Sequence, residues 1–294
     1  MKNPLQHLHL DQAVPGHTTI WIDVAERSVN VLFEEVFAEL VAVLDEMHSK
    51  EPPPMLIFRS AKRKGFIVGA DLNRILAFET DAEIQSFLLT GQAALEKLEA
   101  YPGNTIAVIQ GPCLGGGLEF AMACDFRIAS NAESTQLGMP EAKIGLMPGW
   151  GGTQRLIEIV GFVHGLEMLL GGEAIDAMQS LELQLVDMLF DDLSIEKGLS
   201  QFLGDVFRGT IAKKQAGRTS KETREFVARE FQNRKLNVPF PHSESAILQA
   251  VTIGVDESRA AGFHAERTLF HPLLMSPAVR DGLQRFATRS KPPG

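Results

Sequence analysis

The chain has 294 residues, and its hydrophobic content of 45% and charged content of 22% are ordinary for a soluble globular protein. Its formal net charge of -9 argues against general nucleic-acid binding, which favours a basic surface. No apolar run approaches the roughly 18 residues that span a bilayer, and the first residues lack the apolar core of a signal peptide.

The N-terminal part predicts a strand–helix–strand unit. Residues 18–24 alternate in polarity as a half-buried strand does, and residues 33–48 carry apolar side chains at helical spacing. Three prolines at 52–54 then interrupt the chain, and residues 55–58 form a short apolar run typical of a buried strand. Repeated strand–helix alternation favours an α/β core.

The next segment predicts a turn followed by helices. Gly69 permits an unusual backbone conformation, and Asp71 is suited to cap a helix that begins after it. Residues 81–100 read as one long amphipathic helix that ends before Tyr101.

Residues 104–161 hold most of the chemical signals. An apolar strand is predicted at 106–109 and another at 126–129. Three consecutive glycines occupy 115–117, and a helical run from 118 to 124 follows them. The stretch also carries Glu119, Glu141 after Pro140, and a second glycine-rich loop, Gly149-Trp150-Gly151-Gly152.

Each of these signals has an ordinary structural explanation, but their combination is more specific. Glycines make tight turns, and a glutamate near a helix start is favoured by the helix dipole. Glycines at a helix start also let backbone N–H groups approach a ligand oxygen, which is how a backbone oxyanion hole is built. Two glutamates beside such a hole could move protons to and from carbon or water.

The C-terminal third is predicted to be mainly helical. We therefore divide the chain into an α/β core over 1–200 and a helical region over 201–294, with the charged segment 204–241 as a variable excursion. The predicted elements are helices at 162–171 and 174–184, a strand at 186–190, and helices at 194–208, 220–236, 243–256, 257–273 and 277–288.

The chain resembles the crotonase family, the enoyl-CoA hydratase/isomerase superfamily, from about residue 15 to 200. The matching segments are GFIVGADL at 65–72, GPCLGGGLEFAMACD at 111–125 and GMPEAKIGLMPGWGGTQRL at 138–156. The resemblance implies a crotonase-like spiral of β-β-α units. It also implies an enzyme that adds water to a trans-2-enoyl-CoA to give a 3-hydroxyacyl-CoA in fatty-acid β-oxidation. Coenzyme A would be part of the substrate, with no separate cofactor and no metal.

The same resemblance assigns site residues. Ala70 and Gly116 match the two oxyanion-hole N–H donors, Glu119 matches the glutamate that activates water, and Glu141 matches the one that protonates the α-carbon. Trp150 departs from the simple hydratases and either lines the acyl pocket or belongs to the core. The remaining substrate contacts are expected from Lys62, Arg63, Phe66, Val68, Gly69, Asp71, Leu72, Leu114, Gly115, Pro140, Gly149 and Trp150.

Two features leave alternatives open. The basic loop around Lys62 and Arg63 is either a solvated surface or a contact for the phosphates of coenzyme A. The C-terminal helices resemble those of the hydratase module of the multifunctional fatty-acid oxidation α subunit, where they precede a dehydrogenase module. The chain is thus expected to be a single-module or truncated relative, acting alone, as a trimer-type homo-oligomer, or beside other β-oxidation enzymes.

Other function classes fit less well. A Δ3-Δ2-enoyl-CoA isomerase or a bifunctional enzyme stays open, as does an inactive module that binds CoA thioesters. The dinucleotide, P-loop and serine-hydrolase motifs are absent from the sequence. The two cysteines, Cys113 and Cys124, are too few for a disulfide framework or a zinc site, so we expect buried free thiols in a reducing cytoplasm.

Overall fold

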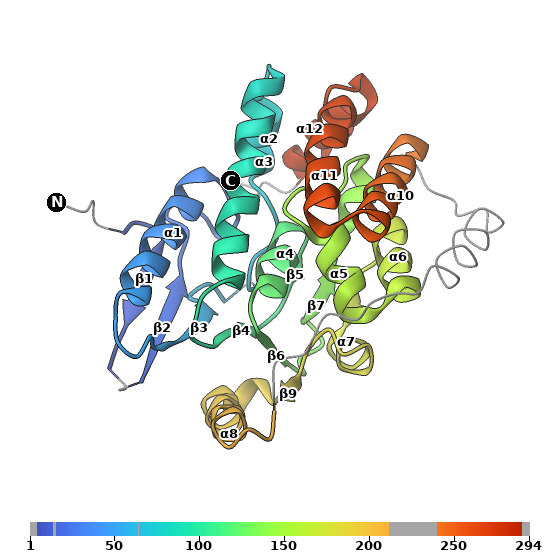
Figure 1. Cartoon of the computed structure of the whole chain (residues 1–294). Coiled ribbons are helices and arrows are strands. Elements are labelled where there is room, and N and C mark those ends of the chain that lie inside the picture. The colour runs from blue at the N-terminus through green and yellow to red at the C-terminus, as the bar shows by residue number, and fades with distance from the viewer. Residues whose placement is uncertain (1–4, 14–15, 64, 212–239, 290–294) are drawn as a thin grey trace.

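A computed structural model describes residues 5–13, 16–63, 65–211 and 240–289 (Figure 1). Its centre is a six-stranded sheet in the order β1-β2-β3-β4-β6-β9, parallel except where β1 pairs antiparallel with β2. These strands are β1 (Leu8–Asp11), β2 (His17–Ile22), β3 (Met55–Ser60), β4 (Thr105–Ile109), β6 (Phe126–Ser130) and β9 (Met188–Phe190).

A second, three-stranded sheet lies beside the site. It consists of β5 (Cys113–Leu114), β7 (Gln136–Gly138) and β8 (Ile175–Asp176). β5 runs parallel to β7, and β8 runs antiparallel to it. Because β4 leads into β5 and β6 leads into β7, successive chain segments alternate between the two sheets. This alternation is the spiral of a crotonase-like α/β fold.

Helices cover both faces of the main sheet. Two hydrophobic clusters separate along β3, with Leu56 and Phe58 in one and Ile57 in the other, as the two-residue period of a strand requires. The helical elements are α1 (Glu34–His48), α2 (Leu72–Ala77), α3 (Asp81–Glu99), α4 (Gly116–Ala123), η1 (Pro140–Ile144), α5 (Gly152–Val160), α6 (Phe162–Gly171), α7 (Ala177–Glu182), η2 (Asp192–Ser194), α8 (Ile195–Phe207), α10 (Pro241–Asp256), α11 (Arg259–Leu274) and α12 (Pro277–Arg289).

The last three helices fold back over the helices that carry the site (Figure 1). α11 packs against α3 and α5, and α12 packs against α2 and η1. Arg280 on α12 donates to the carbonyl oxygens of Leu76 and Phe78, at 2.7 and 3.1 Å. Because these carbonyls lie at the end of α2, the arginine satisfies groups that the helix itself leaves unbonded.

Most predicted elements are confirmed to within a few residues. The first strand, helix and second strand form the predicted parallel unit, and Asp71 caps α2 by accepting a hydrogen bond from Asn73 N at 2.9 Å. Both cysteines are buried free thiols. The predicted division at residue 200 falls inside α8. Lys64 and the predicted helix at 220–236 lie outside the described residues.

One predicted element was wrong in part. The helix expected at 174–184 is the strand β8 followed by the shorter α7, because Ile175 pairs with Leu137 of β7. The strands β1, β5 and β7 were not predicted. β5 and β7 have only two and three residues, and their pairing depends on partners that the local sequence does not show.

Candidate active site

The segment after β3 and the start of α4 bring two backbone amides together. A Cβ atom placed on Gly116 would lie 3.5 Å from the nitrogen of Ala70. Ala70 is held by pairing with Leu32, whose N–H donates to Gly69 O at 2.9 Å and whose carbonyl accepts from Asp71 N at 3.0 Å. The neighbours of Ala70 are therefore fixed on both sides, and its own nitrogen lies near Gly116.

Within the described part of the chain, neither of these amides has a hydrogen-bond acceptor. The N–H groups of Ala70 and Gly116 donate no hydrogen bond to any residue that the structure describes. Gly116 is the first residue of α4, where backbone N–H groups lack helical partners and the helix dipole favours negative charge. The pair is thus suited to hold an oxygen on which negative charge develops.

Glu119 lies in the first turn of α4 and is buried. Its Oε1 accepts hydrogen bonds from Trp150 N at 2.8 Å and from Gly152 N at 2.7 Å. Its Oε2 accepts none from the described residues. One oxygen therefore orients the carboxylate, and the other is left to bind a proton or a water molecule.

Glu141 approaches from η1 on the other side of the glycine run. A Cβ atom on Gly115 would lie 2.5 Å from Glu141 Oε1, so the carboxylate occupies the space that a side chain at position 115 would fill. Gly115 also has a φ of 51°, in the left-handed region that favours glycine. The Oε2 of Glu141 is shielded from solvent and accepts no hydrogen bond from a described residue. An unpartnered carboxylate oxygen of this kind is costly unless a ligand or a proton meets it.

Burial makes both acids weaker. Desolvation, followed by the negative charges of Glu266 and Glu141, raises the pKa of Glu119 well above its ordinary value. Desolvation likewise raises the pKa of Glu141 to about 7, and the charge of Glu266 adds to the effect. Carboxyl groups with a pKa near neutrality can both release and accept a proton at the pH of the cell.

A third buried carboxylate, Glu266 on α11, was missed by the sequence analysis. It accepts hydrogen bonds from the backbone N–H groups of Gly151 at 2.7 Å and Thr153 at 3.0 Å. The Thr153 hydroxyl and Gln92 Nε2 donate to it as well, at 2.5 and 3.1 Å. Desolvation raises its pKa to about 7. A glutamate among ordinary helix residues gives no local signal of such a role.

Trp150 closes the site on the side of α3. The residue is 2% exposed, and its ring lies between the rings of Phe37 and Phe87, with centroids at 4.8 and 5.1 Å. A Cβ atom on Gly116 would lie 2.8 Å from Trp150 Cε3, and one on Gly91 would lie 2.7 Å from Cε2. Two glycines from separate helices therefore make room for the indole.

The predicted contacts in residues 66–72 fall into two groups. Phe66 is fully buried in the core, and the carboxylate of Asp71 is engaged by the α2 cap and by Arg27 at 2.5 Å. Val68, Ala70 and Leu72 are partly exposed. Of the other predicted contacts, Gly69 and Gly115 are buried, Leu114 and Pro140 are partly exposed, and Gly149 is buried with its carbonyl bonded to Gln92.

Asn30, a second residue that the sequence analysis missed, organises this loop. Its side-chain amide donates to the carbonyl oxygens of Ile22 and Phe66, both at 3.0 Å. Its backbone carbonyl oxygen accepts from Val68 N at 3.0 Å. Asn30 is 1% exposed. Its bonds fix the path from β3 to Ala70.

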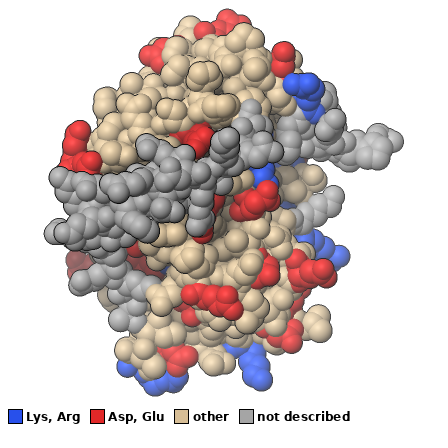
Figure 2. Space-filling model, turned by 90° about the vertical axis from the view of Figure 1, so that its right-hand side faces the viewer, with Lys and Arg blue, Asp and Glu red and all other residues tan. Residues whose placement is uncertain are grey.

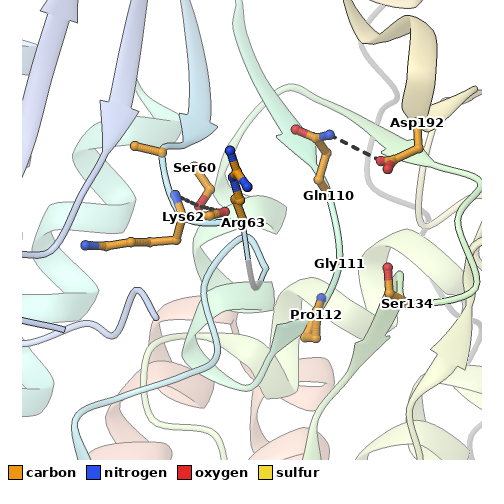
Figure 3. Close-up of a pocket in the computed structure, with 9 residues that line it drawn as sticks. Ser60, Lys62, Arg63, Gln110, Gly111, Pro112, Ser134 and Asp192 are labelled. Carbon is orange, nitrogen blue, oxygen red and sulfur yellow. Dashed lines mark hydrogen bonds between the residues drawn. The ribbon is translucent and has the colours of Figure 1, made fainter. Parts of the chain in front are cut away.

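A polar cavity of about 390 Å³ lies at the ends of β3 and β4 (Figure 3). Figure 3 shows Arg63 at its centre, whereas Lys62 extends away from Gln110. The ammonium group of Lys62 is paired with Asp23, and Arg63 forms no ion pair with a described residue. Of the predicted basic pair, Arg63 is therefore the available cation. The cavity is lined by Ser60, Ala61, Lys62, Arg63, Gln110, Gly111, Pro112, Ser134 and Asp192.

The cavity and the glutamates are joined by two short chain segments. Phe66 N donates to Pro112 O at 2.9 Å, and Leu114 N donates to Ile67 O at 3.0 Å, so residues 66–67 run beside residues 112–114. An elongated ligand could therefore have one end at Arg63 and the other at the paired amides.

Among the described residues on the face seen in Figure 2, acidic side chains are spread over the middle and basic ones lie mainly toward the rim. Among the described helices, none is both long and apolar enough to cross a membrane.

The fold and the site together define a crotonase-type enzyme, and comparison with known proteins agrees. The family model described as enoyl-CoA hydratase/isomerase matches residues 17–215. The chain belongs to this family.

A curated relative extends the match. The chain is 34% identical over 270 residues to the fatty acid oxidation complex subunit alpha of Idiomarina loihiensis, an alignment that covers 89% of this chain and 38% of that protein. The chain thus spans well under half the length of this relative.

Solved structures have the same fold. An enoyl-CoA hydratase from Mycobacterium avium subsp. paratuberculosis matches with a TM-score of 0.68 at 21% identity, covering 99% of each chain. A carnitinyl-CoA dehydratase from Mycobacterium thermoresistibile matches with a TM-score of 0.76 at 16% identity, covering 96% of this chain and 90% of the other. At these identities the likeness is one of fold.

Proposed function

We propose that the protein is an enoyl-CoA hydratase that adds water to a trans-2-enoyl-CoA and forms a 3-hydroxyacyl-CoA. The proposal depends mainly on one observation: two amides that bond to no described residue lie together at the start of α4, which also carries the buried Glu119, and the partly exposed Glu141 lies against Gly115. Family membership and the fatty acid oxidation relative support the substrate class. Coenzyme A would enter as part of the substrate, without a separate cofactor.

The amides of Ala70 and Gly116 would hold the thioester oxygen. When hydroxide adds to the β-carbon, electron density moves through the double bond and the thioester oxygen becomes enolate-like. Preformed N–H donors stabilise that charge more in the transition state than in the substrate, which is what accelerates the reaction. The start of α4 adds the favourable end of its dipole.

The two glutamates would carry the protons. Glu119 removes a proton from water through its available Oε2 as the water oxygen bonds to the β-carbon. Glu141 gives a proton to the α-carbon, and its pKa of about 7 suits that role near neutral pH. One carboxyl gains a proton and the other loses one, so the net change is the addition of one water molecule.

The two ends of the substrate would meet different surroundings. Arg63 would contact the phosphates of coenzyme A in the polar cavity, and Lys62, already paired with Asp23, would contribute less. The acyl chain would run toward Trp150, whose indole fills the space beside Gly116. We therefore propose that Trp150 bounds the acyl side of the site and favours short chains.

A 3-enoyl-CoA isomerase uses the same oxyanion hole but needs no water. The presence of both carboxylates, each with an oxygen that accepts no bond from the described residues, favours hydration as the main reaction. A role in fatty-acid β-oxidation beside partner enzymes is proposed from the curated relative alone.

Turnover of crotonyl-CoA by the purified protein tests the proposal. We expect loss of the conjugated thioester absorbance and formation of 3-hydroxybutyryl-CoA, with slower or no conversion of a 3-enoyl-CoA in a parallel assay. Binding of crotonyl-CoA without turnover would instead support an inactive CoA-thioester module. Faster conversion of the 3-enoyl-CoA would make the protein an isomerase.

A further inference from the structure

The loop that enters α5 is held by two carboxylates in alternation. The N–H groups of Trp150 and Gly152 donate to Glu119, and those of Gly151 and Thr153 donate to Glu266. The first carboxylate comes from α4 and the second from α11. Successive amides of the loop thus donate alternately to Glu119 on one side and to Glu266 on the other.

This arrangement gives Glu266 more hydrogen bonds than a packing role requires. All four of its contacts come from donors, namely the backbone N–H groups of Gly151 and Thr153, the Thr153 hydroxyl and the Gln92 side chain. These donors stabilise a negative charge on the Glu266 carboxylate. They lower its pKa and so oppose the desolvation that raises this pKa to about 7.

We propose that Glu266 is a positioning residue for Glu119, fixing the shared loop that orients the Glu119 carboxylate and placing a second negative charge across that loop. The inference builds on the proposed hydratase function, in which Glu119 removes the proton from water. A nearby negative charge makes Glu119 hold a proton more strongly and so makes it a better base.

The charged groups around Glu266 lie on α3, α4, α5, α11 and η1. Arg155 of α5 opposes the effect of the neighbouring acids, and its guanidinium also donates to Trp150 O at 2.7 Å. α10 packs against α11 and α5 near Ala250, whose carbonyl accepts from the uncharged Gln154. The charged groups are Glu119 on α4, Glu141 on η1, Arg155 on α5, Glu99 on α3 paired with Arg155 and Arg259, and Arg267 on α11 bonded to Gln92.

The substitution Glu266→Gln tests this role with little change in size. It removes the charge and turns one oxygen into an NH2 group that faces N–H donors. We expect kcat for crotonyl-CoA to fall about 10- to 100-fold, because small misplacements of catalytic groups cause losses of this size. KM should stay within about twofold, because Glu266 does not touch the proposed substrate path.

The pH profile separates positioning from simple destabilisation. Without the neighbouring charge, the pKa of Glu119 should fall, so the acidic limb of kcat/KM should move to lower pH. A matched control is Glu158→Gln on α5, a partly buried acid that pairs with Arg259 at 3.5 Å and does not touch the loop; it should leave rate and profile unchanged. An equal loss of activity at every pH, or unchanged kinetics, would overturn the proposal.

Two further measurements keep the test decisive. Thr153→Val removes one donor to Glu266 and should give a smaller change in the same direction if Glu266→Gln does not fold. Titration of 13C-labelled glutamates by NMR reads the pKa of Glu119 without any substrate. If the wild-type protein turns over no enoyl-CoA, the hydratase proposal fails, yet a lower Glu119 pKa in the variant would still support the coupling and an unchanged one would still refute it.

Discussion

The two ends of the proposed substrate path are built on opposite physical principles. Glu119 and the residues around it are largely buried, and backbone amides hold one oxygen of its carboxylate. Around Arg63 the cavity is polar and exposed, with a cation that no described residue neutralises. Charge development during a reaction is stabilised best by fixed dipoles in a dry site, whereas an ionic ligand is captured best by an accessible charge.

The comparison teaches which substitutions should affect rate and which should affect binding. Changes in the dry region should act on kcat, on selectivity and on the pH dependence of stability. Changes in the polar cavity should act on KM and should depend on salt.

The largest effect is expected from removing either catalytic acid. Glu119→Gln and Glu141→Gln should each lower kcat for crotonyl-CoA hydration by about 100- to 10,000-fold, the usual contribution of a general acid or base. Steady-state assays at neutral pH measure this. The exposed Glu133→Gln serves as control and should keep full activity. Full activity in either Glu119→Gln or Glu141→Gln would contradict the two-carboxylate mechanism.

The next largest effect is expected on the preference for acyl-chain length, which we assign to the indole of Trp150. Trp150→Ala should raise kcat/KM for an eight-carbon substrate relative to a four-carbon one by about 10- to 100-fold. Removal of the indole opens an apolar space, and the additional methylene groups of the longer chain can bind there. The other tryptophan of the chain, Trp21, lies on β2 against Arg59 and offers the matched control Trp21→Ala. The pocket assignment is wrong if both variants change the ratio equally or neither does.

The buried acids should also set how stability varies with pH. The pKa of Glu141 is raised from 4.5 to about 7, so its contribution to stability is complete below pH 4.5 and is lost as pH rises through about 7. Glu141→Gln should therefore be more stable than wild type at pH 8, by up to about 3 kcal/mol, and nearly equal to it at pH 4.5. Urea unfolding at the two pH values measures the difference. A constant difference across pH would show that charge burial is not its cause.

The smallest effect is expected in the cavity. Arg63→Ala should raise KM for crotonyl-CoA about fivefold, and Lys62→Ala should raise it less because that ammonium already pairs with Asp23. Crotonyl-pantetheine lacks the nucleotide and provides the control substrate. If Arg63→Ala raises KM equally for both substrates, Arg63 does not contact the nucleotide end.

The local sequence determined much of the fold and part of the site. The alternation of strands and helices, the cap at Asp71 and the glycine run before Glu119 are short-range patterns, because each depends on neighbours within a few residues. The alternation predicted an α/β core, and the resemblance of residues 65–72, 111–125 and 138–156 to the family implied the crotonase-like fold. The placement of the acyl-CoA contacts stays a prediction.

Only the tertiary structure decided which distant groups meet. Glu266 contacts Gly151 across 115 positions of sequence, and Trp150 lies against Gly91 of α3 because packing of α3, α4 and the α5 loop brings them together. A buried glutamate and a surface glutamate look alike in a helical pattern, since burial is a property of the packed elements and not of the residue. The hydrogen-bonding demand of the loop amides could be read only after that packing had removed them from water.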